Sequence, residues 1–145
     1  MKRLAALAIA ATALLALPAA GQDRTPVLVV VTSGNAQTQL MSMILTMQAA
    51  QKGAAPHVLL CGAAGDIALR DAPESATTTQ PPRDLSPQGL MQTIMQQTGT
   101  EVQVCAIYLP AKDLDASALI DGVTVADPAE MGAMIADPAV KVLGF

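Results

Sequence analysis

Aromatic side chains are almost absent from this chain, which has no tryptophan, one tyrosine (Tyr108) and one phenylalanine (Phe145). Proteins that bind bases, flavins or sugars by stacking need aromatic platforms. The scarcity of such platforms therefore argues against these classes of ligand. The core must be built from alanine, valine, leucine, isoleucine and methionine.

Metal-ligating and catalytic side chains are also few, with one histidine, His57, and two cysteines, Cys61 and Cys105. One histidine and two distant cysteines make a poor zinc set, and a single histidine gives little support for a Ser-His-Asp triad. The cysteines do not form a C-x-x-C pair, which argues against a thioredoxin-type dithiol. We expect no metal site and no cofactor.

Methionine thioethers offer one alternative, a copper(I) site at Met41, Met43 and Met47. However, Met43 and Met47 share the apolar face of a predicted helix. We therefore expect them to pack in the core or at a subunit contact.

The first 21 residues have the composition of a secretory signal peptide. Lys2 and Arg3 precede an uncharged apolar stretch at residues 4–17, and small residues follow at 18–21. This stretch is shorter than the ~20 residues that a spanning helix needs, so a retained membrane anchor is the less favoured alternative. We predict that residues 22–145 form a single exported domain, periplasmic or secreted, with no membrane contact after cleavage.

Positive charge is scarce in that domain. Loss of Lys2 and Arg3 leaves six of the eight cations, against 12 acidic residues. Because nucleic-acid binding rests on clustered Lys and Arg, we expect no nucleic-acid partner.

Short apolar runs alternate with segments of helical periodicity. Strands are predicted at 27–31, 57–61, 122–126 and 140–143, and a further strand lies in the run 102–110 that contains Cys105. Helices are predicted at 37–52, 67–70, 86–98, 113–120 and 127–136. Gly53 and Gly99 are expected to end helices, and Ser86-Pro87 and Asp127-Pro128 to begin them.

Continuous rather than alternating apolar runs are typical of a parallel sheet covered on both faces. We predict a flavodoxin-like α/β fold, a three-layer sandwich with a mostly parallel five-stranded sheet and helices on both faces. Residues 71–86, which include Pro73, Pro81 and Pro82, are predicted to form a long flexible loop.

Ligands of such sheets bind beyond the C-terminal strand ends, where the strand order reverses. If the first strand is central, with the second and third on either side, this crevice lies between Ser33-Gly34-Asn35 and Cys105. Cys105 is therefore our candidate catalytic residue. Ser33, Gly34, Asn35 and Cys61 are candidate binding residues.

A disulfide between Cys61 and Cys105 would suit an oxidising compartment. Bridged Cα atoms lie within about 4.4–6.8 Å, whereas strands separated by a third are about 9–10 Å apart. We therefore do not expect the bridge unless the two strands are neighbours or the Cys61 loop folds across. The cysteines are then either buried inert thiols or include a reactive thiolate near a cation, for which Lys112, Arg70 and Arg83 are candidates.

Four segments together resemble the DsrE-like family of small sulfur-relay proteins: Thr32-Ser33-Gly34, the helix at 40–50, residues 57–62 and residues 102–105. The resemblance spans about residues 27–145. It implies a five-stranded parallel sheet, a trimer or hexamer, and a persulfide on the cysteine of a Val-Cys pattern, which Val104-Cys105 matches.

The resemblance also implies a sulfur donor or acceptor protein as partner. Two features depart from the family: no arginine follows Cys105 in residues 106–110, and this chain carries a predicted export signal. Because the family includes members without transfer activity, the alternative function is a non-catalytic oligomeric binding or assembly module with inert thiols.

Overall fold

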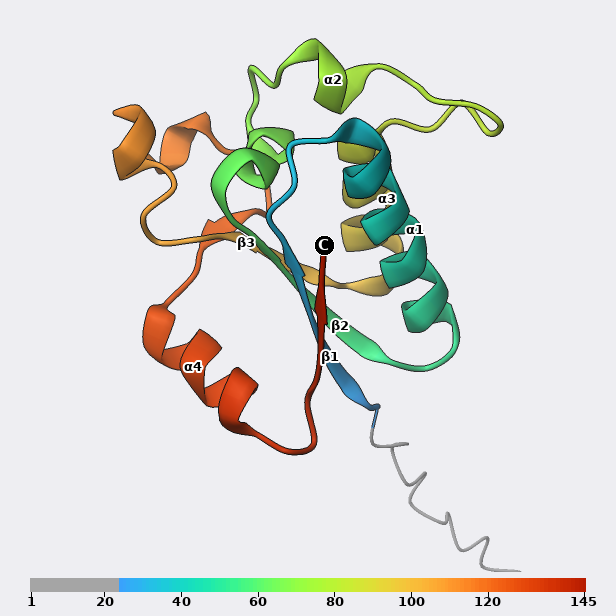
Figure 1. Ribbon diagram of the computed structural model, residues 1–145, viewed down its shortest axis with the longest axis vertical. Coiled ribbons are helices and arrows are strands. Elements are labelled where there is room, and N and C mark those ends of the chain that lie inside the picture. The colour runs from blue at the N-terminus through green and yellow to red at the C-terminus, as the bar shows by residue number, and fades with distance from the viewer. Residues whose placement is uncertain (1–23) are drawn as a thin grey trace, which may run out of the picture.

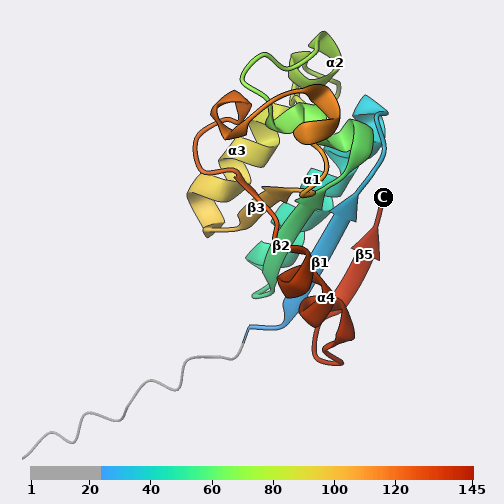
Figure 2. The ribbon, with the colours of Figure 1, turned by 90° about the vertical axis from the view of Figure 1, so that its left-hand side faces the viewer.

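The computed structural model describes residues 24–145, so the predicted signal peptide at 1–21 lies outside the described residues. A five-stranded sheet forms the centre, in the order β4-β3-β2-β1-β5 (Figures 1 and 2). Its strands are β1 (Pro26–Val31), β2 (Ala55–Leu60), β3 (Glu101–Val104), β4 (Thr124–Val125) and β5 (Lys141–Gly144). All four pairings are parallel, which confirms the predicted α/β class.

Helices cover both faces of this sheet. Figure 1 shows α1 (Ala36–Gln51) and α3 (Pro87–Thr98) together on one side and α4 (Pro128–Ala136) on the other. Alternate side chains of a strand point to opposite faces. Val27, Val29 and Val31 of β1 accordingly belong to the larger core under α1 and α3, whereas Leu28 packs in the smaller core with Met131 of α4.

The expectation that β1 separates β2 from β3 is wrong. β2 pairs directly with β3, and β1 lies between β2 and β5. The connections through α1 and α3 lead from β1 to β2 and from β2 to β3, so both move in the same direction across the sheet. The connection through α4 moves in the opposite direction and places β5 beside β1. Because crossovers are right-handed, a return step places its helix on the opposite face.

The helix ends predicted at Gly53, Ser86, Gly99 and Asp127 are confirmed, and α1 also has a cap at its start that was not predicted. The Asn35 carboxamide oxygen accepts hydrogen bonds from two backbone N–H groups at the start of α1, at 3.0 and 3.1 Å. Ser86 and Asp127 cap α3 and α4 in the same way. Gly53 and Gly99 follow α1 and α3 with φ of 89° and 68°, the left-handed region that glycine adopts without strain.

Three segments differ from the sequence-based expectation. The helix predicted at 67–70 is a longer 3₁₀ segment, η1 (Gly62–Ala68), and the one predicted at 113–120 is replaced by two short pieces, η2 (Pro110–Lys112) and η3 (Ala116–Ala118). Residues 71–86 contain a short helix, α2 (Glu74–Thr77), whose Ala76 is buried. The flexibility of this segment stays a prediction. Between residues 24 and 145, no helix has the length and apolar character needed to cross a membrane.

Candidate functional site

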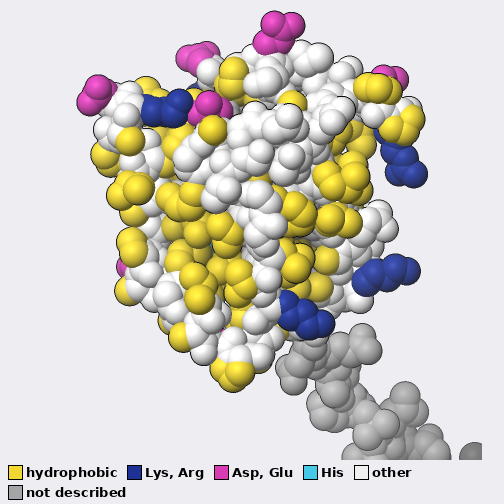
Figure 3. Space-filling view, viewed as in Figure 1, with side chains coloured by type: hydrophobic (Ala, Val, Ile, Leu, Met, Phe, Trp, Pro, Cys, Tyr) yellow, Lys and Arg dark blue, Asp and Glu magenta, His cyan; other side chains and the backbone are white. Residues whose placement is uncertain are grey.

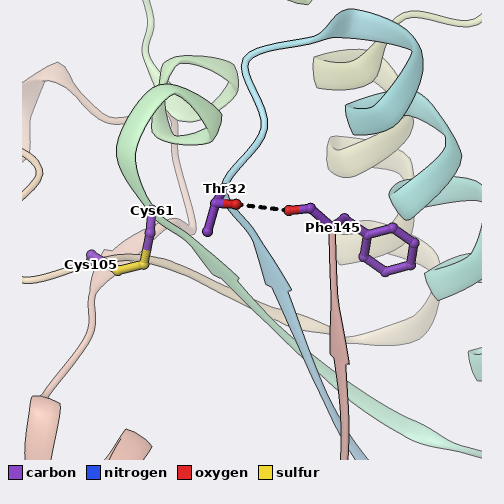
Figure 4. Close-up of a disulfide and its surroundings, with 4 residues drawn as sticks. All are labelled: Thr32, Cys61, Cys105 and Phe145. Atoms are coloured by element: carbon purple, nitrogen blue, oxygen red, sulfur yellow. Dashed lines mark hydrogen bonds between the residues drawn. A yellow bond between two sulfur atoms is a disulfide. The ribbon is translucent and has the colours of Figure 1, made fainter.

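Four residues lie side by side at the C-terminal edge of the sheet. Thr32, Cys61, Cys105 and Phe145 directly follow β1, β2, β3 and β5 (Figure 4). Backbone hydrogen bonds of 2.7–2.9 Å join each to a neighbouring strand or strand end. The hydrogen-bond ladder of the sheet therefore continues one residue past the strands and holds these four residues in a row.

Cys61 and Cys105 form a disulfide, with their Cα atoms 5.1 Å apart. The pairing of Leu60 with Val104 places the two cysteines opposite each other. Our expectation against this bridge is therefore wrong, because the strands that carry the cysteines are neighbours. The alternative of two buried inert thiols is wrong as well, since neither cysteine is free and both are partly exposed.

Cys105 lines a pocket of about 330 Å³ between the sheet and α4. Every lining residue is apolar or glycine, and Cys61 is not among them; they are Leu59, Cys105, Ala106, Ile107, Ala126, Pro128, Met131, Gly132 and Ile135. Figure 3 shows hydrophobic side chains gathered over the sheet next to α4, with the charged side chains towards the margins of this face. The two cysteines thus differ in their surroundings, because only Cys105 faces this pocket.

A polar cluster beside the disulfide joins the segment after β2 to the segment after β3. The Tyr108 hydroxyl donates to the Asp66 carboxylate at 2.6 Å, and the Lys112 ammonium pairs with the same carboxylate oxygen at 2.8 Å. Burial, the hydrogen bond to Asp66 and the charge of Asp66 raise the pKa of Tyr108 above its ordinary value. This cluster was not predicted from the sequence, although Tyr108 is the only tyrosine and lies three residues after Cys105.

Glycine allows close packing at two points around the site. A Cβ atom at Gly65 would overlap the ring of Tyr108, and one at Gly34 would lie 2.9 Å from the Ala63 side chain. The segment at 33–35 therefore packs against η1, which follows Cys61. It does not adjoin the Cys105 strand as expected, because β2 lies between them.

The polar groups of the predicted binding segment are used locally. The Asn35 carboxamide caps α1, and the Ser33 hydroxyl accepts a hydrogen bond from the Asn35 N–H at 3.1 Å. The Ser33 carbonyl accepts from the Gln39 side chain at 2.9 Å. A ligand-binding role for Ser33, Gly34 and Asn35 stays a prediction.

The candidate cations do not line the pocket at Cys105. Lys112 pairs with Asp66, and Arg70 pairs with Asp121 at 2.6 Å. Arg83 lines a separate pocket beside α1. Lys112 and Arg70 are therefore each paired with a carboxylate, and a role for any of the three in stabilising a Cys105 thiolate stays a prediction.

His57 and the methionines have structural positions. The His57 Nε2 atom lies 2.9 Å from the Gln103 carboxamide oxygen on the neighbouring strand. Met43 and Met47 are buried in the core, whereas Met41 is half exposed. Among residues 24–145, no three His, Cys, Asp or Glu side chains are grouped as metal ligands.

No family model and no curated protein sequence matches this chain. Solved structures do match it. The crystal structure of the ychN protein from E. coli superposes with a TM-score of 0.63 at 18% identity, over 84% of this chain and 99% of that chain. A protein of unknown function from Methanobacterium thermoautotrophicum, MTH1491, gives 0.59 at 15% identity, over 83% and 98%. At these identities the likeness concerns architecture, and the chain has the α/β fold of the ychN protein and MTH1491.

Proposed function

We propose that this chain is an exported DsrE-like sulfur carrier in which Cys105 holds sulfane sulfur as a persulfide once the disulfide to Cys61 is reduced. The observation that carries the proposal is the position of Cys105, which directly follows β3 and lines the apolar pocket under α4. The fold shared with the ychN protein and the family-type pattern Val104-Cys105 support a DsrE-like framework.

The chemistry starts from the reduced pair. A dithiol reductant converts the Cys61–Cys105 bond into two thiols and is itself oxidised to a disulfide. The Cys105 thiolate then attacks the outer sulfur of a persulfide donor, R–S–SH. A new S–S bond forms on Cys105, the donor S–S bond breaks, and RS⁻ leaves. Attack of an acceptor thiolate on the outer sulfur passes that sulfur on and restores the Cys105 thiolate.

The lining of the pocket indicates the kind of donor. Because none of the lining residues within 24–145 is charged, contact with a donor rests on apolar burial. Ile107 and Ile135 are 79% and 58% exposed and belong to the pocket wall. An apolar segment around the cysteine of a donor or acceptor protein fits this surface better than a free anion.

The direct test is sulfur loading. The mature chain predicted from the sequence, residues 22–145, is reduced, freed of reductant and incubated with a small uncharged persulfide such as that of 2-mercaptoethanol. The intact mass of the Cys61→Ser variant is expected to rise by the mass of one sulfur atom. The Cys105→Ser variant, which lacks the thiol proposed to carry the sulfur, is the matched control and should gain no sulfur at position 105. A Cys61→Ser protein that is folded and can be alkylated at Cys105 but gains no sulfur contradicts the proposal.

Export and self-association belong to the same proposal. A disulfide between the chain's two cysteines suits an oxidising, periplasmic or extracellular location. Exposed apolar side chains on α4 and β5, such as Ile135, Val142 and Leu143, support self-association, and the family resemblance implies three or six subunits. Light scattering of the purified protein measures the subunit number, and a monomer at all concentrations contradicts this part.

A second candidate function is a non-catalytic assembly module. The disulfide favours it, because a bond that closes a 44-residue separation can serve purely as a structural constraint. In that case the reduced protein gains no sulfur, and the Cys61→Ser/Cys105→Ser variant keeps its oligomeric state.

A further inference from the structure

We infer that Cys61 is the resolving thiol of this site: it attacks a persulfide on Cys105, closes the observed disulfide and releases hydrosulfide. This inference rests on the proposed function and deepens it. The Cys105 persulfide would then be an intermediate whose sulfane sulfur the chain reduces, and the disulfide would be the oxidised end state of each turnover.

The fold holds the two cysteines together without needing the bond between them. β2 and β3 are paired up to Leu60 and Val104, and the Cys105 N–H donates to the Leu60 carbonyl at 2.9 Å. A backbone separation of 5.1 Å between the Cα atoms is therefore set by the sheet. After reduction, the two sulfur atoms remain within reach of each other.

Contacts beyond the strands keep the same two segments together. Tyr108 and Lys112, from the segment after Cys105, both bind Asp66, from the segment after Cys61. Backbone hydrogen bonds of 2.9 Å also join residues 68 and 70 to residues 118–120. Because little freedom is lost when the bond closes, ring closure between the cysteines is favoured over retention of the persulfide.

The pocket assigns different roles to the two thiols. Cys105 lines the apolar pocket under α4, in which we expect a donor to dock, whereas Cys61 does not line it. A donor therefore meets Cys105 first. Cys61 is then positioned to attack the sulfur of Cys105 from the neighbouring strand.

The step balances in atoms and electrons. The Cys61 thiolate attacks the inner sulfur of Cys105–S–SH, the Cys61–Cys105 bond forms, and the Cys105 S–SH bond breaks. The outer sulfur leaves as HS⁻ with the bonding pair, so the sulfane sulfur is reduced by two electrons and the two cysteines are oxidised. A dithiol reductant restores the pair for the next cycle.

The test compares the reduced wild type with Cys61→Ser and Cys105→Ser, using the persulfide of 2-mercaptoethanol and measuring hydrosulfide, free thiols and intact mass. Wild type is expected to release one hydrosulfide per chain and to lose both thiols. Cys61→Ser is expected to keep one added sulfur atom and to release no hydrosulfide. Circular dichroism checks that each variant is folded, and the wild-type measurement does not depend on either variant.

Each other result has a defined meaning. If wild type keeps the persulfide and its Cys61 thiol can still be alkylated, the inference is overturned. The sulfur-carrier proposal then still stands. A persulfide on Cys61 in the Cys105→Ser variant overturns the assignment of roles. A Cys61→Ser protein that gains a 2-mercaptoethanol group instead of a sulfur atom shows ordinary disulfide exchange, which overturns both the inference and the sulfur-carrier proposal.

Discussion

Removal of the disulfide should weaken the fold without abolishing it. In the Cys61→Ser/Cys105→Ser variant, the 44-residue separation between the two positions is no longer closed in the unfolded chain. Loop-closure entropy for a loop of that length corresponds to about 4 kcal/mol at 25 °C. For a domain of this size, that loss lowers the melting temperature by roughly 10–20 °C.

Chemical denaturation followed by circular dichroism measures this difference. The oxidised wild type, the reduced wild type and the double variant are compared at one pH. We expect the reduced protein and the double variant to unfold at similar, lower denaturant concentrations. The double serine variant excludes reoxidation as a source of error.

Two results would refute the reasoning. A double variant as stable as the oxidised wild type would show that loop closure contributes nothing here. A variant without a cooperative transition would show that the β2–β3 pairing and the Tyr108–Asp66–Lys112 cluster do not hold the strand ends together unaided. The second result would also remove the physical basis for a reversible cysteine pair.

Three further predictions follow from contacts near the site. Gly65→Ala should destabilise the fold by about 1–3 kcal/mol, because the added methyl group overlaps the Tyr108 ring. Gly132→Ala, at a position within α4 where an added methyl group would contact nothing, should not destabilise it. The denaturation midpoints of the two variants test this difference. Asp66→Asn should lower the pKa of Tyr108, which ultraviolet titration of this single tyrosine measures. Because the pKa of Tyr108 is higher in the folded than in the unfolded protein, the protonated Tyr108 hydroxyl stabilises the fold at pH values below the ordinary tyrosine pKa. This contribution to the free energy of unfolding is lost as the pH rises through the raised value. Asn35→Ala should cost about 1 kcal/mol of unfolding free energy through loss of the α1 cap, and an unchanged midpoint would contradict this.

Local signals in the sequence predicted most of the elements correctly. The cap at Ser86, the stop at Gly99 and the apolar run of β1 act over a few residues, so their effect does not depend on the rest of the fold. The 3₁₀ segments after β2 and β3 were mispredicted. Their conformation depends on packing between segments distant in sequence, as the contact of Tyr108 with Gly65 shows.

The candidate site was predicted in part. Cys61 and Cys105 were correctly placed at strand ends, but their pairing depends on which strands are neighbours. Equivalent apolar runs do not specify strand order, so an order with β1 between β2 and β3 was equally compatible with the pattern. The expected crevice between Ser33 and Cys105 was wrong for this reason.

The amino-acid sequence by itself determined the α/β class, the ends of the main helices, the shortage of metal ligands and the location of both cysteines at the C-terminal ends of strands. These properties follow from short-range periodicity, capping and composition. Only the tertiary structure decided that β2 and β3 are neighbours, that Cys61 and Cys105 are bonded and that Cys105 alone faces the pocket under α4. Those properties depend on the direction of each crossover, which is set by how helices and sheet bury their apolar faces together.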